Sequence, residues 1–197
     1  QVELSHQMLD TMLNGSIALC DAGTGIGKTY AYLVAGVVFR RYRSRAGLPN
    51  QPLLISTSSI ALQGAIIHDY LPFLSKVMMA DGMLASPLRA VLRKGKSHYV
   101  CDARLMKRLQ TANLDRKNPL AKAALLSMRD HLDLDMAPHL SGYDRERICV
   151  PPTCDCGKTE CRYLCYLDVC ASERYAIQVC NHNLLLADAI HQGSGKR

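Results

Sequence analysis

The chain opens with apolar residues at helical spacing, followed by a short continuous apolar run. Residues 2–13 place hydrophobic side chains three and four positions apart, and Asn14-Gly15 is a typical stop signal. Residues 17–20 are apolar without interruption, as in a strand that is buried on both faces. A glycine-rich stretch then leads into residues 30–43, whose apolar content and length favour a helix. The pattern therefore predicts a helix, a strand and a second helix in this order.

Strand and helix signals continue to alternate along the chain. Residues 53–57 predict a second buried strand, and Ser58 or Ser59 is positioned to cap a helix that runs to Tyr70. Strand, helix and strand in this order form a βαβ unit, so we expect an α/β fold with a parallel sheet. Further predicted elements are a helix over 73–79, a strand over 88–92, helices over 102–111 and 120–132, a strand over 175–180, a helix over 184–190 and a flexible tail from 192.

The sheet pattern is interrupted between residues 95 and 174. This stretch carries the two predicted helices over 102–111 and 120–132, and then an irregular segment over 149–170 with Pro151-Pro152 and six cysteines. We find no internal repeat and no low-complexity segment. The pattern therefore predicts an α/β domain interrupted by a largely helical, cysteine-rich insertion.

The glycine-rich stretch after residues 17–20 fits the phosphate-binding pattern [AG]-x-x-x-x-Gly-Lys-[Ser/Thr] between a strand and a helix. Its glycines permit a tight turn in which successive backbone N–H groups face an anion, and the helix start adds its positive dipole end. Lysine in this pattern reaches the β- and γ-phosphates of a nucleotide, and the hydroxyl binds Mg²⁺. A plain glycine-rich turn is the alternative. The predicted nucleotide-binding residues are Ala22, Gly23, Thr24, Gly25, Ile26, Gly27, Lys28 and Thr29.

The net charge and the hydropathy of the chain indicate which classes of partner it can bind. The net charge is +7, and basic residues cluster over 40–45, 93–96 and 104–108, which suits a polyanion such as nucleic acid. A solvated basic surface is the plainer alternative. The chain has no 18-residue uncharged apolar run and no signal-peptide layout, so we expect an intracellular protein without a membrane partner.

Nine cysteines are many for an intracellular chain, where thiols stay reduced. Cys101 stands alone, and a compact group follows over 149–170. One remote and three clustered thiolates suit a [4Fe–4S] cluster, and four thiolates equally suit tetrahedral Zn²⁺. The remaining alternative is that the cysteines are small buried hydrophobes, which we expect for Cys20 and Cys180 inside predicted strands.

The order of these motifs resembles the DinG/XPD-type iron–sulfur helicases of superfamily 2. Residues 22–29 match the family's first helicase motif, and residues 54–63 are similar to the next one. Residues 93–101 resemble its Lys-Gly-Arg-x-x-Tyr-x-Cys segment, and residues 179–185 resemble the apolar-Asn-His-x-Leu-Leu segment after the cluster. Gln1 lies where the family has its adenine-reading glutamine.

The resemblance implies a RecA-like motor domain formed by residues 1–94 and 175–197, with residues 95–174 as an Fe–S-type insertion. It implies ATP and Mg²⁺ as cofactors, held by Gln1 and residues 22–29, with Lys28 and Thr29 acting in hydrolysis. The implied [4Fe–4S] ligands are Cys101, Cys156, Cys161 and Cys165. The implied DNA contacts are Ser56, Thr57, Lys94, Lys96 and Tyr99.

Two features depart from the family pattern. The usual cluster spacing is close to Cys-x₄-Cys-x₅-Cys, whereas Cys165 comes early and Cys170 late after Cys161, so a vestigial, empty site is an alternative to a cluster. No Asp-Glu-Ala-His motif occurs, so we expect the chain to be the first portion of a longer helicase, truncated at both ends and inactive alone.

The activity implied by the resemblance is ATP-dependent 5′→3′ movement on single-stranded DNA and unwinding of forked duplexes in the bacterial cytoplasm or nucleoid. The pathway is DNA repair or, as in the DinG-like helicases of type IV CRISPR systems, action with an RNA-guided complex. A nonenzymatic zinc-binding nucleic-acid module and a DNA-stimulated ATPase without unwinding activity are the competing interpretations.

Overall fold

The structure is a computed structural model that describes residues 1–111, 119–154, 156 and 161–193. The chain forms two compact units. The sheet unit comprises Gln1–Arg93 and Cys170–Arg197, and the helical unit comprises Lys94–Val169. The predicted tail from 192 falls mostly on residues 194–197, which lie outside the described residues.

The sheet has three parallel strands, which confirms the predicted parallel α/β arrangement. They are β1 (Leu53–Ser56), β2 (Ala90–Leu92) and β3 (Ile177–Cys180), in the order β1-β3-β2. Leu53 and Ala90 both face Ile177 in the register, so β3 is the central strand. All four β3 residues are buried, as expected for a strand covered on both faces.

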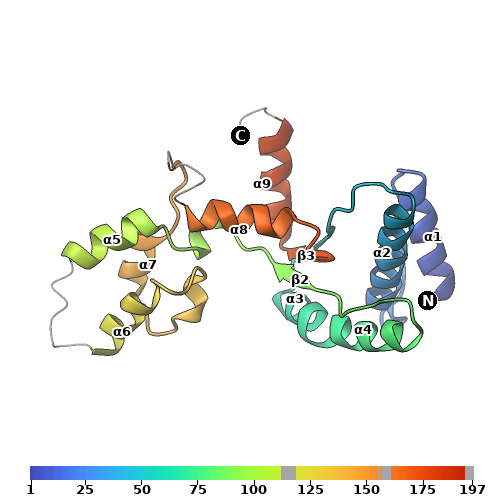
Figure 1. Cartoon of the computed structure of the whole chain (residues 1–197), viewed down its shortest axis with the longest axis horizontal. Coiled ribbons are helices and arrows are strands. Elements are labelled where there is room, and N and C mark those ends of the chain that lie inside the picture. Colours follow the sequence, from blue (N-terminus) through green and yellow to red (C-terminus); the bar gives the residue numbers. More distant parts are fainter. Residues whose placement is uncertain (112–118, 155, 157–160, 194–197) are drawn as a thin grey trace. The chain divides into compact units, whose positions relative to one another are not determined.

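The helices of the sheet unit flank these strands. They are α1 (Val2–Leu13), α2 (Lys28–Arg45), α3 (Ile60–Ala65), the π-helix η1 (Ile66–Tyr70), α4 (Leu71–Ala80) and α9 (His182–Gly193). Figure 1 shows α1 lying along α2. The hydrophobic core joins α2, η1, α4 and β3 through Leu33, Val37, Ile66, Leu71, Leu74, Met78, Ile177 and Val179.

The helices predicted up to Tyr70 and over 73–79 are joined, because α3, η1 and α4 follow one another without a gap. Pro72 is the second residue of α4 and comes directly after the π-turn over 66–70, where the helix geometry changes. Ile66 is fully buried in this turn.

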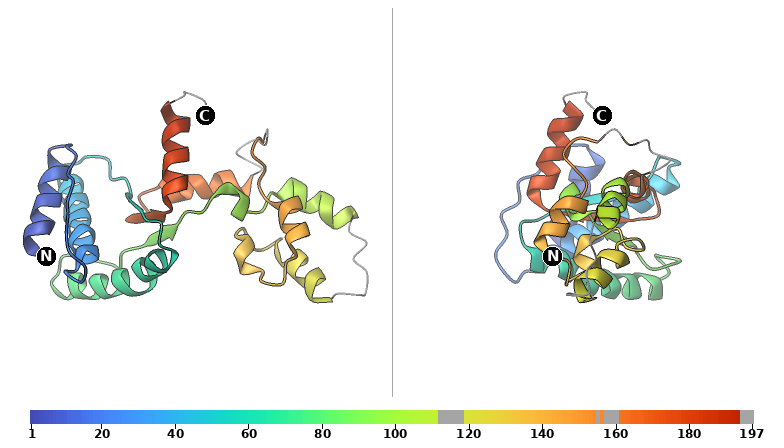
Figure 2. Two further views of the ribbon diagram at one scale, coloured as in Figure 1. Left: turned by 180° about the vertical axis from the view of Figure 1, so that it is seen from behind. Right: turned by 90° about the vertical axis from the view of Figure 1, so that its left-hand side faces the viewer.

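The predicted strand over residues 17–20 is also wrong. This segment has no regular structure, pairs with none of the three strands, and leaves the side chains of Ile17 and Leu19 100% and 103% exposed. Figure 2 shows it as part of the loop between α1 and α2. A short apolar run gains a strand's stability only by pairing and by burial on the sheet, and here it has neither. Cys20, expected to be buried in that strand, is exposed.

The helical unit contains η2 (Lys96–His98), α5 (Asp102–Thr111), α6 (Pro119–Ser127), η3 (Leu134–Met136), α7 (Gly142–Ile148) and most of α8 (Arg162–Ala171). Its core includes Val100, Leu105, Leu125, Met128, Leu134 and Ile148. The irregular structure predicted for residues 149–170 is wrong from residue 162 onward, where α8 begins. In the described parts of both units, every helix is too short or too polar to cross a membrane.

Candidate nucleotide-binding site

The glycine-rich loop leads directly into α2. Gly25 and Gly27 have φ angles of 79° and 80°, in the left-handed region that favours glycine, and Gly27 caps the start of α2. The Lys28 amine donates hydrogen bonds to the carbonyl oxygens of Ala22, at 2.6 Å, and Gly23, at 2.9 Å. The lysine therefore closes the loop back on itself at a helix N-terminus, a location that favours anions.

Gln1 lies against this loop, although it is 26 positions away in sequence from Gly27. A Cβ atom on Gly27 would lie only 1.7 Å from Gln1 Nε2, so the Gln1 carboxamide occupies the space that glycine leaves open. The packing of α1 along α2 brings them together, and the Ser5 hydroxyl donates to the Ala31 carbonyl at 3.2 Å. The structure thus brings together the predicted adenine-reading residue and the predicted phosphate loop.

The other predicted loop residues are accessible. Gly23, Thr24 and Ile26 are exposed, and Thr29 is half-buried in the first turn of α2. Burial raises the pKa of Tyr32, and a hydrogen bond with the Thr29 side chain opposes that effect. The Thr29 hydroxyl is therefore oriented by a neighbour one turn along the helix.

A second polar cluster lies where β1 and β3 end. These strands are parallel, so the residues after them meet at one edge of the sheet, where ligands bind in open α/β folds. Ser56 Oγ and His182 Nδ1 are 2.7 Å apart. Burial raises the pKa of the Cys180 thiol, and a hydrogen bond with Ser56 offsets part of this rise. His182 is thus the partner of the predicted DNA-binding residue Ser56.

Thr57 is held by the turn that follows β1. Its N–H donates to the Cys180 carbonyl at 3.0 Å, and its hydroxyl accepts from the Ser59 N–H at 3.2 Å. Gln63 is buried and donates to the Thr57 carbonyl at 2.9 Å. Gln63 therefore supports the turn that presents Ser56 and Thr57.

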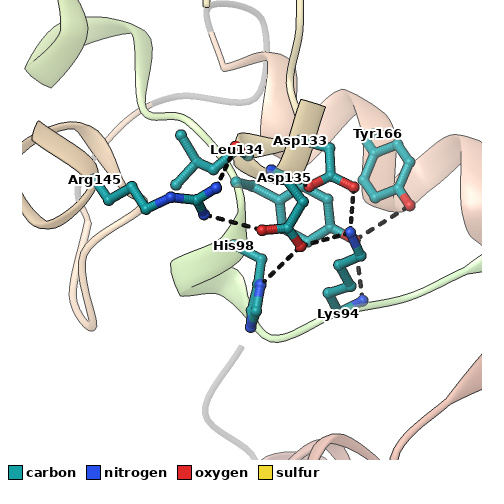
Figure 3. Close-up of polar contacts among 8 residues, drawn as sticks. Lys94, His98, Asp133, Leu134, Asp135, Arg145 and Tyr166 are labelled. Atoms are coloured by element: carbon teal, nitrogen blue, oxygen red, sulfur yellow. Dashed lines mark hydrogen bonds and ion pairs between the residues drawn. The ribbon is translucent and has the colours of Figure 1, made fainter. Parts of the chain in front are cut away.

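Lys94, a predicted DNA contact, is bound within the helical unit (Figure 3). Its amine donates to Asp133 Oδ2 at 2.6 Å and to Asp135 Oδ2 at 2.8 Å. Asp135 also accepts from Arg145 at 2.9 Å, and His98 Nδ1 lies 3.3 Å from it. Burial opposes the charged form of Lys94, but the hydrogen bonds with the two aspartates prevail, and its pKa is raised. The charge of Lys94 is thus already paired.

Tyr99 is 3% exposed, with its ring centroid 5.2 Å from that of Tyr163 and 5.1 Å from that of Tyr166. Its hydroxyl accepts from the Lys94 N–H at 3.0 Å. No open ring face is left for a base, so Tyr99 is a packing residue of the helical unit. Lys96 is exposed and its amine donates to the Pro152 carbonyl.

The Asp135 network predicts a specific acid sensitivity. The hydrogen bond from Lys94 is the main reason that the pKa of Asp135 is lowered from 3.8 to about 2. A carboxylate with a depressed folded-state pKa stabilises the fold above its ordinary pKa and loses that contribution as the pH falls toward the folded value. Asp135→Asn is therefore expected to reduce the loss of stability between pH 5 and pH 3, measured by urea unfolding. Asp130→Asn, at an exposed carboxylate of the same unit, is the matched control. An unchanged pH dependence in Asp135→Asn would contradict the assignment.

The predicted cluster ligands differ widely in exposure. Cys101 is buried, Cys161 is half-buried, and Cys156 and Cys165 are exposed. Across the described residues, no three histidine, cysteine, aspartate or glutamate side chains form a group that could hold a metal ion. A hydrogen bond with Cys154 is the largest effect in raising the pKa of Cys156 to about 11, with smaller effects from the charges of Cys101 and Cys161. Cys154 is therefore a neighbour of Cys156 that the motif spacing does not select.

Comparison with curated proteins identifies relatives of part of this chain. Residues of this chain are 30% identical over 126 positions to the Bacillus subtilis protein named 3′-5′ exonuclease DinG, covering 64% of this chain and 12% of that protein. They are 35% identical over 85 positions to the ATP-dependent DNA helicase DinG of Photobacterium profundum, covering 43% and 10%. Part of this chain is therefore similar to DinG proteins.

A helicase named YoaA is also similar to part of this chain. The ATP-dependent DNA helicase YoaA of Haemophilus influenzae is 31% identical over 122 positions, covering 62% of this chain and 17% of YoaA. No protein-family model matches the chain. The predicted resemblance to DinG is thus confirmed. The chain spans less than a fifth of the length of these relatives, so the activity of a whole DinG-like protein is a matter for proposal.

Proposed function

We propose that this chain is the nucleotide-binding portion of an ATP-dependent DNA helicase motor. The observation that carries the proposal is the loop over residues 22–29, closed by Lys28 at the N-terminus of α2 with Gln1 against Gly27. In this proposal residues 1–94 and 175–197 belong to a RecA-like motor domain, and residues 95–174 are an insertion.

Different residues of the loop would bind ATP and Mg²⁺. Lys28 already faces two carbonyl oxygens, which are weaker partners for an ammonium group than the β- and γ-phosphates. Phosphate oxygens would therefore replace Ala22 and Gly23 as its acceptors. The Thr29 hydroxyl would bind Mg²⁺, and the Gln1 carboxamide would bind the adenine edge from beside Gly27.

DNA binding is assigned to the strand-end cluster of Ser56, Thr57 and His182. Hydroxyl and imidazole groups at the carboxyl end of a parallel sheet can donate to backbone phosphates without reading the sequence. Lys96 is the remaining exposed cation among the predicted DNA contacts. Lys94 and Tyr99 are left out of the proposed contacts, because one is paired with two aspartates and the other is buried.

The helical unit carries donors for a metal centre. Thiolates are the ligands of both [4Fe–4S] and structural zinc, and Cys101, Cys156 and Cys161 remain three proposed ligands. Cys154 and Cys165 compete for the fourth place, because Cys154 is hydrogen-bonded to Cys156 while Cys165 lies on α8. When bound, the group would act as a structural cross-link between these segments.

Two single variants distinguish the competing ligands. We expect Cys154→Ser to lower the iron or zinc content of the purified protein at least about tenfold, because one thiolate of four is lost. Cys165→Ser is expected to leave the metal content unchanged. Metal analysis with the visible absorption spectrum measures both the amount and the kind of centre. The reverse order of the two effects would restore Cys165 as the ligand, and no metal in any protein would leave the centre vestigial.

The experiment that tests the function is strand displacement by the full-length protein. A forked duplex with a 5′ single-stranded tail is expected to be unwound with ATP and Mg²⁺, and a fork with only a 3′ tail is not. Lys28→Ala is the control and should abolish unwinding. ATP hydrolysis stimulated by DNA without displacement on either fork would favour the nonunwinding ATPase instead.

The proposal also includes the cellular pathway in which the protein acts. The relatives named as DNA helicases support action on DNA, and we propose work in the bacterial cytoplasm or nucleoid, either in DNA repair or beside an RNA-guided CRISPR complex. Copurification of a guide RNA with the full-length protein from its host separates the second role from the first.

A further inference from the structure

A second basic site lies at the opposite end of the sheet from Ser56 and His182. A cavity of about 350 Å³, open to solvent, is lined by the last turns of α2, by the segment before β2, by the segment before β3 and by Asn50 before β1. In a parallel sheet these segments meet at the amino ends of the strands. The phosphate loop is at the other end of the 18-residue helix α2, so the two sites are separate.

Arginines from three different segments converge on this cavity. They are Arg40, Arg41 and Arg45 of α2, Arg89 before β2 and Arg174 before β3. Glu173 is the one acidic residue among the described residues that line it, so five positive charges face one negative charge. The helix dipole favours arginine at the end of α2, but it does not account for Arg89 and Arg174, which come from other elements.

Most of this positive charge is not neutralised within the described residues. Arg40 and Arg41 donate to the backbone carbonyls of Gln51 and Met83, and the Arg89 guanidinium lies 5.7 Å from the centre of the Tyr175 ring. These partners carry no net charge. Burial lowers the pKa of Arg40, against the raising effect of Glu173, so the site is partly desolvated without a matching anion.

Asn50 also lines the cavity. Its N–H donates to Glu173 at 3.0 Å, and its side-chain oxygen Oδ1 is buried with no hydrogen-bond donor among the described residues. Asn50 therefore holds Glu173, the acidic residue of the cavity wall, in place.

We propose that this cavity binds a small phosphorylated ligand at a site distinct from the ATP loop. Arginine is suited to phosphate because its planar guanidinium donates two parallel hydrogen bonds. The volume falls in the range of small-molecule sites, about 300–1,000 Å³. The proposed DNA contact Ser56 lies at the other end of the sheet from these arginines. The chain would then have a second anion site, and its occupancy would depend on the concentration of the phosphorylated compound.

Inorganic pyrophosphate is the probe, and Lys28→Ala is the background in which the ATP loop is disabled. Isothermal titration of the full chain is expected to show saturable binding of one pyrophosphate. Adding Arg45→Glu and Arg174→Glu should weaken it at least tenfold. These two side chains form no hydrogen bond or ion pair with other described residues, so the fold loses no contact, and circular dichroism checks this. Lys76→Glu with Lys122→Glu gives the same change of charge at exposed sites elsewhere and should have no effect.

Three results would overturn the proposal. They are no saturable binding in Lys28→Ala, an equal loss in the Lys76/Lys122 control, and displacement of pyrophosphate by a single-stranded oligonucleotide, which would assign the arginines to DNA. ATP binding by the arginine variants with Lys28 intact is measured in parallel. Its presence or absence tests the ATP loop separately from this cavity.

Discussion

Replacing Gly27 with alanine is expected to weaken ATP binding at least about tenfold. Gly27 has a φ of 80°, and an L side chain in this left-handed conformation costs about 1–2 kcal/mol. The added Cβ would also lie 1.7 Å from Gln1 Nε2 and push that carboxamide away from the loop. Each 1.4 kcal/mol is about a tenfold change in affinity, so the backbone strain corresponds to about 5- to 30-fold, and the displacement of Gln1 adds to this loss. Fluorescent ATP titration of the full-length protein measures the effect.

Gly23→Ala is the matched control within the same loop. The structure shows no atom within 4 Å of a Cβ at Gly23, and its φ lies outside the positive range. Its ATP affinity should therefore stay within about twofold of the wild type, a change worth about 0.4 kcal/mol. Equal losses in both variants would show that the left-handed backbone and the contact with Gln1 do not determine the binding conformation of the loop.

The second large effect is expected in the sheet. Ile177 is fully buried on the central strand β3, and Ile177→Ala should lower the free energy of unfolding by about 2–5 kcal/mol. Leu54 lies on the edge strand β1 and is 44% exposed, so Leu54→Ala should change it by about 0.5 kcal/mol. Urea unfolding of both variants tests the strand order. A larger loss for Leu54→Ala would place β1, and not β3, at the centre.

The sequence predicted the elements that carry a strong local pattern. The helix over 2–13, the strands over 53–57 and 175–180 and the helix into Arg43 are all present within a few residues, because their periodicity and stop signals are local. The run over 17–20 failed for a nonlocal reason. Its composition is that of a strand, but a strand requires a neighbour to pair with, and the described strands leave it unpaired.

The candidate site divides in a similar way. Residues 22–29 follow one another in the sequence, so the motif itself specifies the loop that the structure shows. Lys94 and Tyr99 were expected to face DNA because they lie in a basic, aromatic segment. Their partners Asp133, Asp135 and Tyr166 come from segments about 40 and 70 positions away, and no local pattern reveals such pairings.

The cysteines and arginines show the same limit. Motif spacing selected Cys165 over Cys154, although the structure pairs Cys154 with Cys156. The basic run over 40–45 indicates an anionic partner only in general terms. The fold brings Arg89 and Arg174 to that run and makes part of it a cavity wall. Composition therefore predicts an anion as partner but does not say where it would bind.

The central claim is that a nucleoside triphosphate binds the loop over residues 22–29 while DNA contacts the same sheet. Calorimetric titration of ATP with Mg²⁺ into the intact protein, with and without a single-stranded oligonucleotide, tests it most directly. We expect saturable binding at one site that is lost in Lys28→Ala, with the oligonucleotide changing the affinity. Absence of ATP binding under both conditions would contradict the account.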